Sequence, residues 1–326
     1  MDDDGTTGVH IGIDPFGARH DPSFDADDDS SLARECEIVE DGGVLAVHDP
    51  VAVGVRPPLA FVDGAVRTDA RLTRTTPEGT TTGVVGSFVA GAVRVPPPGQ
   101  GRAVVDPIDR HRVVVFTHGH RVALPPQPGG WAWESHSTPE PEAFKAAARV
   151  RTLMREAEVA IAEDLSATGV LTVLDGPLSM VRGGWSKPIL GYVKSHPVPM
   201  LERESWVRVP TIRPGQRTSV FAINGNLYAA YLRVGPPARG ASPWAGIARL
   251  EVPAGVGRDA AIAAIDEAAS WLPSFASAAH RDDRAPVNLV PVAGLEWRLR
   301  HEFDDSRLAV RAVTDAVLQL GSGVAA

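Results

Sequence analysis

The sequence lacks the features that define several protein classes. One cysteine, Cys36, excludes an internal disulfide and a cysteine-cluster zinc site. No run approaches the roughly 18 apolar residues of a membrane-spanning helix, and no apolar leader follows a basic start. Lysine and arginine number 32 against 40 aspartates and glutamates, so a formal charge of −8 offers no overall basic surface for nucleic acid. We therefore expect a cytoplasmic protein with no membrane partner.

The composition is that of a folded protein with many loops. Hydrophobic residues make up 44% and charged residues 22% of 326 positions, which excludes wholesale disorder. Glycine (32) and proline (28) are frequent but stay below the share that marks low-complexity chains. Residues 1–50 are acidic and show little hydrophobic periodicity, so we expect a variable N-terminal segment there. Residues 51–326 are expected to form the main domain.

Hydrophobic patterning predicts strands first and then helices mixed with strands. β-Branched residues, with glycine or proline between the runs, indicate strands over 57–64, 67–73, 81–95 and 110–118. Helix formers dominate 139–165, where Ser137 or Thr138 is available as an N-cap. The remaining expected elements are strands at 170–176, 188–194, 217–223, 227–234 and 246–253, and helices at 258–272, 295–303 and 307–320. This order predicts an α/β fold with a mixed sheet flanked by helices.

Three carboxylates stand out by their positions. Asp63 and Asp175 each precede a glycine at the expected end of an apolar strand. On a helical wheel, Phe144, Met154 and their neighbours form an apolar stripe, and Glu158 falls about 40° from Met154, within that stripe. A carboxylate on a core-facing stripe is costly unless it is paired, protonated or bound to a cation. Glu156 and Glu163 fall on the opposite, solvent-facing side.

Simple geometry brings these three carboxylates together. If the strands of Asp63 and Asp175 are neighbours, their ends place the two side chains about 5 Å apart. The helix that precedes the second strand packs on the same sheet and contributes Glu158. Converging anionic groups require compensation, which a hard cation such as Mn²⁺ or Mg²⁺ supplies. Simpler interpretations exist for each part, because Asp-Gly is a common turn and a buried helical glutamate is commonly a salt-bridge partner.

Several segments resemble those of the NurA-type nucleases. They are FVDGAVRTDAR, REAEVAIAEDL with VLTVLDGPLS, GYVKSH, and PWAGIARLEVP, within residues 59–301. The resemblance implies an RNase H-like core and a catalytic metal site for Mn²⁺ at Asp63, Glu158 and Asp175. It also implies a homodimer that acts on DNA with a HerA-like hexameric ATPase. Lys194 matches a basic family position. His301 is a weaker match, because the family's C-terminal tyrosine is missing.

The sequence therefore predicts a metal-dependent deoxyribonuclease that processes DNA ends. The alternative is a catalytically impaired, nuclease-like scaffold subunit of a DNA translocase, which the missing tyrosine favours. An aspartate-nucleophile phosphatase is disfavoured, because Ala65 stands where a second aspartate is expected. Four arginines in or beside the later strands are candidates for a DNA-backbone groove, although scattered surface positions are the commoner outcome: Arg213, Arg217, Arg233 and Arg249.

Overall fold

The computed structural model describes residues 10–13, 35–51, 54–178, 189–278, 280 and 284–322. Its strands are β1 (His10–Ile13), β2 (Cys36–Ile38), β3 (Val47–His48), β4 (Leu59–Thr76), β5 (Gly79–Val95), β6 (Val104–Phe116), β7 (Glu134–Ser137), β8 (Leu171–Asp175), β9 (Ile189–Val193), β10 (Arg217–Thr218), β11 (Phe221–Ile223), β12 (Leu227–Arg233) and β13 (Ile247–Pro253). Its α-helices are α1 (Ala143–Ala167), α2 (Arg203–Trp206), α3 (Arg258–Trp271), α4 (Val290–Arg300) and α5 (Ser306–Ser322).

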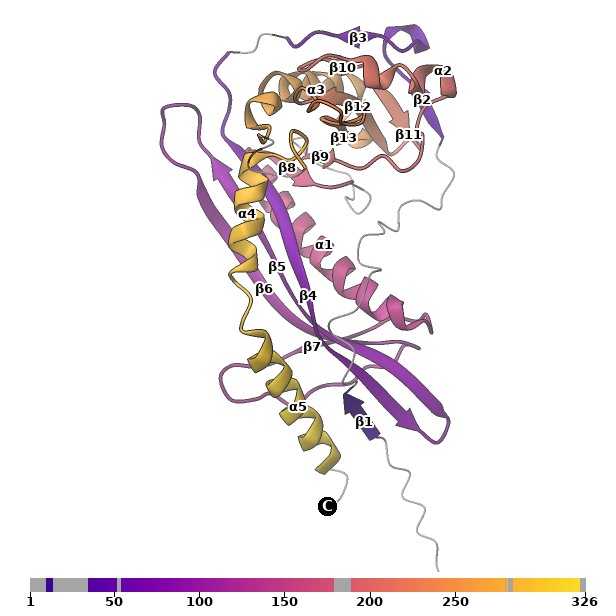
Figure 1. Cartoon of the computed structure of the whole chain (residues 1–326), viewed down its shortest axis with the longest axis vertical. Coiled ribbons are helices and arrows are strands. Elements are labelled where there is room, and N and C mark those ends of the chain that lie inside the picture. Colours follow the sequence, from indigo (N-terminus) through magenta and orange to yellow (C-terminus); the bar gives the residue numbers. More distant parts are fainter. Residues whose placement is uncertain are drawn as a thin grey trace, which may run out of the picture.

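These strands form one large mixed sheet with flanking helices, which confirms the expected α/β class. The main path through the sheet is β2-β11-β12-β13-β9-β8-β4-β5-β6-β7. Figure 1 shows the long strands β4, β5 and β6 running down the molecule, with α1 and α4 along them. The shorter strands β9 to β13 lie together with α3 at the top of the view in Figure 1.

Strand β4 differs from its expected form. Two strands separated by a turn at Asp63-Gly64 were expected, but β4 continues through both residues. Opposite them, Gly91 and Ala90 of β5 continue the antiparallel ladder, which is interrupted by one register shift, between Thr68 and Ala70. The 17-residue strand β5 holds this stretch of backbone extended, so the turn preference of an Asp-Gly pair is overridden. Asp63 therefore lies within a strand.

Strand β8 lies between β4 and β9 and is parallel to both. Its register with β4 pairs Leu59 with Leu171 and continues to Val62 with Leu174. Its register with β9 ends at Asp175 opposite Tyr192. The strands that carry Asp63 and Asp175 are thus neighbours, which is the condition for the convergence of the two aspartates, and the expected end of β8 at Asp175 is confirmed.

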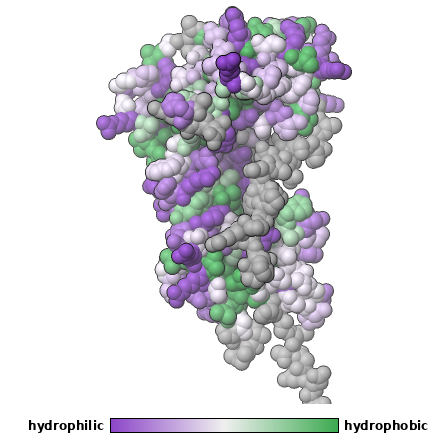
Figure 2. Space-filling view, in the orientation of Figure 1, coloured by the Kyte–Doolittle hydropathy of each residue, from purple (hydrophilic) through white to green (hydrophobic). Residues whose placement is uncertain are grey.

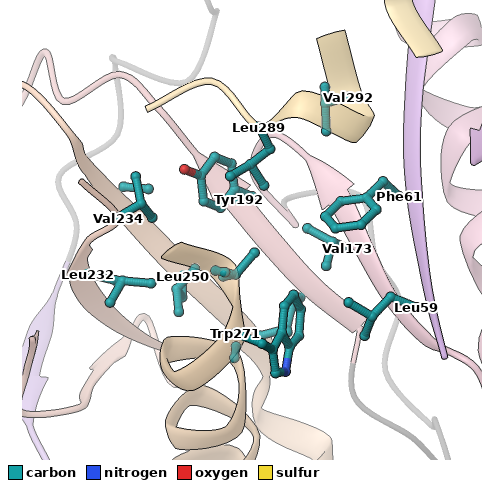
Figure 3. Close-up of a cluster of buried hydrophobic side chains, with 14 of the residues drawn as sticks. Leu59, Phe61, Val173, Tyr192, Leu232, Val234, Leu250, Trp271, Leu289 and Val292 are labelled. Carbon is teal, nitrogen blue, oxygen red and sulfur yellow. The ribbon is translucent and has the colours of Figure 1, made fainter. Parts of the chain in front are cut away.

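The two faces of the sheet pack against different helices. On one face, Phe61, Val173 and Tyr192 share a core with residues of α3 and α4, and Figure 3 shows these three side chains near Leu289 and Val292. Because side chains alternate along a strand, the residues between them point to the other face. There the alternate residues, Ala60, Val62 and Leu174, pack under Ile161 and Leu165 of α1.

Helix α1 confirms the expected helix except at its start. It begins at Ala143, and its N-cap, Glu142, makes no side-chain capping hydrogen bond. Neither Ser137 nor Thr138 caps it; the Thr138 hydroxyl instead bonds the Glu140 carboxylate. Prolines at 139 and 141 disfavour helical backbone in the residues before them, which delays the start. Phe144 is 55% exposed and does not join the apolar stripe.

Part of the N-terminal segment joins the sheet. Strand β2 pairs with β11, β3 pairs with β10, and β1 pairs with β4. The acidic cluster at 25–31 lies outside the described residues, and the boundary at residue 50 stays a prediction. None of the helices in the described part of the chain has the length and apolar character needed to span a bilayer. The face in Figure 2 mixes hydrophilic and hydrophobic residues.

Candidate functional site

Asp63 and Asp175 lie beside each other where β8 ends. They directly follow the last β4–β8 pair, Val62 with Leu174. Between this pair and Leu72, where β1 begins to pair, no strand of the described residues lies opposite β4 on that side, and the Gly64 backbone N–H donates to Asp63 Oδ1 at 2.8 Å. By strand alternation both aspartates belong to the sheet face of Phe61 and Val173, which α3 and α4 cover. The chain thus places two carboxylates in a gap of the sheet.

Lys194 neutralises one of these aspartates. It directly follows β9, and its Nζ donates to Asp175 Oδ2 at 2.6 Å and to Asn288 Oδ1 at 3.2 Å. Two positions before it, β9 contributes Tyr192, whose hydroxyl donates to the Val287 carbonyl at 2.6 Å. The lysine that the motif singled out therefore contacts a predicted site residue, and Asn288, which the motif did not indicate, fixes its position.

Glu158 reaches the same corner from the other face. It is fully buried, as the helical wheel predicted, while Glu156 and Glu163 are exposed. Its Oε2 accepts a hydrogen bond from Arg155 Nη1 at 2.8 Å, and the same nitrogen donates to the Asp175 backbone carbonyl at 2.7 Å. A Cβ placed on Gly64 would lie 2.3 Å from Glu158 Oε1. The glycine after Asp63 therefore serves close approach rather than a turn.

Burial and mutual repulsion raise the pKa values of Asp63 and Glu158. The pKa of Asp63 lies well above its ordinary value because of burial first and then because of the charges of Asp175 and Glu158, which Lys194 partly offsets. Burial also raises the pKa of Glu158, although Arg155 opposes the shift. Burial acts to lower the pKa of Arg155, but Glu158 holds it above its ordinary value. The site is thus a cluster of coupled charges.

The donor set suits a hard divalent cation. Glu158 Oε1 and Asp175 Oδ1 are buried, and neither bonds a described residue. Unpaired buried carboxylate oxygens are costly, and oxygen is the ligand that Mg²⁺ and Mn²⁺ prefer. The cluster is more open than a preformed metal centre, because its three ligand atoms do not all lie within 4.8 Å of one another. A shared ion requires these side chains to move toward each other.

Among the described residues, the group that meets this distance criterion is Glu40, Asp41 and His48. All three have protein partners. Glu40 binds the buried Arg217 guanidinium through both oxygens, at 2.7 and 3.0 Å, and Asp41 accepts hydrogen bonds from Ser219 at 2.6 Å and His48 at 2.8 Å. We interpret this group as an ion-pair network that attaches residues 40–48 to β10.

Other candidates occupy different places. His301 is exposed and donates from Nδ1 to the Trp297 carbonyl at 2.7 Å, and no contact within the described residues joins it to the three carboxylates. The four arginines were expected either in a DNA-backbone groove or at scattered surface positions. Three of them are at least 96% buried, which contradicts both expectations: Arg217, Arg233 and Arg249. Their partners are carboxylates or backbone carbonyls rather than solvent. Arg213 alone is exposed.

No family model matches the chain, and no curated protein is detectably similar to it in sequence. The likeness to the NurA-type nucleases therefore depends on the motif residues themselves. The residues that motif reasoning missed are Gly64, Arg155 and Asn288. Of these, Arg155 alone left a local signal, because it lies three positions before Glu158 and so on the same side of the helix.

Proposed function

We propose that this protein is a metal-dependent deoxyribonuclease that hydrolyses phosphodiester bonds at DNA ends. The observation that carries the proposal is the cluster of Asp63, Glu158 and Asp175 at one corner of the sheet, in which two buried carboxylate oxygens accept no hydrogen bond from any described residue. Burial of such a cluster lowers the stability of the metal-free chain, and clusters of this kind are concentrated at functional sites. An RNase H-like arrangement of the sheet, implied by the resemblance, agrees with this assignment.

Each residue of the cluster has a distinct role in this proposal. Asp63 and Asp175, from neighbouring strands, hold Mn²⁺ or Mg²⁺, and Glu158 contributes a further oxygen. A bound divalent ion lowers the pKa of a water molecule and stabilises charge on a phosphate. Arg155 fixes one oxygen of Glu158 and so directs the other toward Gly64. Lys194 orients Asp175 and provides a cation for a phosphate oxygen.

The partners follow from the same proposal. The resemblance implies a homodimer that receives DNA from a HerA-like hexameric ATPase. A net charge of −8 supports such a partner, because the chain has no overall positive charge with which to attract DNA by itself. Tight binding of duplex DNA by the isolated protein at physiological salt would contradict this part of the proposal.

A second function has one observation in its favour. Arg155 and Lys194 already pair with Glu158 and Asp175, so two of the three carboxylates have cationic partners without a metal ion. A nuclease-derived scaffold subunit of a DNA translocase that no longer cleaves DNA would have this arrangement. The two functions differ in one property, because only the nuclease requires Mn²⁺ binding that depends on the carboxylates.

The test is digestion of end-labelled linear DNA with Mn²⁺. The variants Asp63→Ala, Glu158→Ala and Asp175→Ala remove the cluster one residue at a time. Glu163→Ala is the matched control, because Glu163 is an exposed glutamate on the same helix. The proposal predicts cleavage by wild type and by the control, and loss of cleavage in the three cluster variants that still fold by circular dichroism. Equal cleavage by all five proteins would refute it.

A further inference from the structure

A cavity of about 370 Å³ opens beside Lys194, the residue that also bonds Asp175. Its lining contains two tryptophans and a histidine and consists of Lys194, His196, Pro197, Pro199, Trp206 and Trp244. The volume lies within the range of small-molecule sites. Because Lys194 belongs to both, the cavity lies next to the buried carboxylate cluster.

The two tryptophans form a stacking platform on a rigid base. The ring centroids of Trp206 and Trp244 are 4.3 Å apart with an interplanar angle of 33°. Both rings meet Tyr231 edge to face, at 5.8 and 5.9 Å, and Tyr231 itself stacks on Phe221 at 5.6 Å. Tyr231 and Phe221 are fully buried, whereas the tryptophans are half-buried. A planar ligand can extend this stack.

Arg233 holds the chain that follows Trp206, the last residue of α2, and the chain on either side of Trp244. It is 3% exposed, and its guanidinium donates to the carbonyls of Ile212 and Pro210, after Trp206, at 2.7 and 2.9 Å. It also donates to the carbonyls of Ala245 and Pro243, on either side of Trp244, at 2.5 and 2.8 Å. No carboxylate among the described residues pairs with this buried cation, so four backbone dipoles stabilise it. The aromatic platform is therefore preorganised.

His196 supplies a hydrogen-bond acceptor at the cavity. Its Nε2 lies 3.0 Å from the Ile247 carbonyl, which accepts only a proton donor, so Nδ1 carries the lone pair. Nδ1 is buried and has no hydrogen-bond partner among the described residues. Burial, with a contribution from Arg249, lowers the pKa of His196 to about 4, so the ring is neutral at pH 7. An unpaired acceptor beside an aromatic platform matches the N–H groups on the edge of a nucleobase.

We propose that this cavity binds one unpaired nucleobase of the DNA strand that the carboxylate cluster cleaves. The inference depends on the proposed function for the identity of the ligand as DNA. The base stacks on the outer face of the pair formed by Trp206 and Trp244, and Lys194 contacts the adjoining phosphate. A turn of the His196 ring brings its buried Nδ1 to one of the N–H groups of the base. A base within a duplex has neither a free face nor a free pairing edge. The preferred substrate is therefore a single-stranded end.

The test measures binding of a labelled oligothymidylate to the full chain without metal. Trp206→Ala and Trp244→Ala should each weaken binding roughly 5- to 150-fold, the effect of removing one base-stacking ring. Trp297→Ala is the matched control, since Trp297 is 64% exposed and packs on His301, away from the cavity lining. Its affinity should equal that of wild type. Wild-type affinity in both folded cavity variants, or equally tight binding of blunt duplex, would overturn the inference.

A second measurement covers variants that fail to fold. Thymidine monophosphate should quench the tryptophan fluorescence of wild type saturably, and inorganic phosphate alone should not. The quenching should decrease in Trp206→Phe and Trp244→Phe, which keep a ring in place. Absence of quenching, or equal quenching by phosphate, would overturn the inference. Nucleotide binding without any DNA cleavage would refute the proposed nuclease but leave the cavity assignment intact. Cleavage that the tryptophan substitutions do not affect would refute the cavity assignment but leave the proposed nuclease intact.

Discussion

Replacement of Gly64 by alanine tests the geometry of the carboxylate cluster. The new Cβ would lie 2.3 Å from Glu158 Oε1 and 2.8 and 2.9 Å from Cγ and Sδ of Met154. Real Cβ contacts are not this short, so α1 or the Glu158 side chain must move. Overpacking of a buried site costs about 1–3 kcal/mol. We therefore expect Gly64→Ala to lower the free energy of unfolding by that amount and to weaken Mn²⁺ binding.

The matched control is Gly294→Ala, in the interior of α4. A Cβ there meets no atom within 4 Å, and alanine in a helix is about 0.5–1 kcal/mol more stable than glycine. The two substitutions are chemically identical, so urea denaturation of both variants isolates the effect of position, and calorimetric titration of Mn²⁺ measures the site. A Gly64→Ala protein with wild-type stability and wild-type Mn²⁺ affinity would refute the close approach of Glu158 to β4.

Three further predictions concern buried charges. Because the pKa of Asp63 is raised in the folded chain, the unfolded chain loses this proton first, and the stability of the metal-free chain falls as pH rises above the ordinary aspartate range. Asp63→Asn should therefore raise the free energy of unfolding at pH 7 by about 1–3 kcal/mol in urea denaturation. A loss of stability in this variant would contradict the prediction. The lowered pKa of His196 means that the unfolded chain takes up its proton first, so stability should fall by roughly 3 kcal/mol between pH 6.5 and 4. His196→Gln should show a shallower pH dependence, and an unchanged one would refute it. Arg233→Met leaves four carbonyls without their donor, so it should lower the free energy of unfolding by at least about 2 kcal/mol and weaken oligothymidylate binding. Wild-type stability together with wild-type binding would refute the role of Arg233 in holding the aromatic platform.

Local sequence was sufficient for the features that depend on periodicity. The inward orientation of Glu158 follows from the helical repeat of α1, and the end of β8 follows from the glycine after Asp175. The helix that connects β7 to β8 predicts that β8 returns to the same sheet, whereas the choice of β4 as its parallel neighbour belongs to the sheet order, which local sequence does not specify. These features bring the three carboxylates to one corner of the sheet.

The features that depend on distant partners were not predictable. The continuity of β4 through Asp63 and Gly64 comes from β5, whose length no local pattern around Asp63 reveals. The approach of Glu158 from the face opposite to the two aspartates follows from the sheet order, which sequence alone did not specify. Arg233 resembles any strand-end arginine, and only the folded chain brings the carbonyls of two loops around it.

The most direct measurement of the central claim is a calorimetric titration of Mn²⁺ into the full chain. Wild type and Glu163→Gln should bind Mn²⁺ alike, because Glu163 is exposed and apart from the cluster. Asp63→Asn keeps the Oδ1 that accepts the Gly64 N–H but loses its charge, so its Mn²⁺ binding should be abolished or greatly weakened. Binding that is the same in all three proteins, or absent from wild type, would contradict the assignment of these carboxylates as a metal-binding centre.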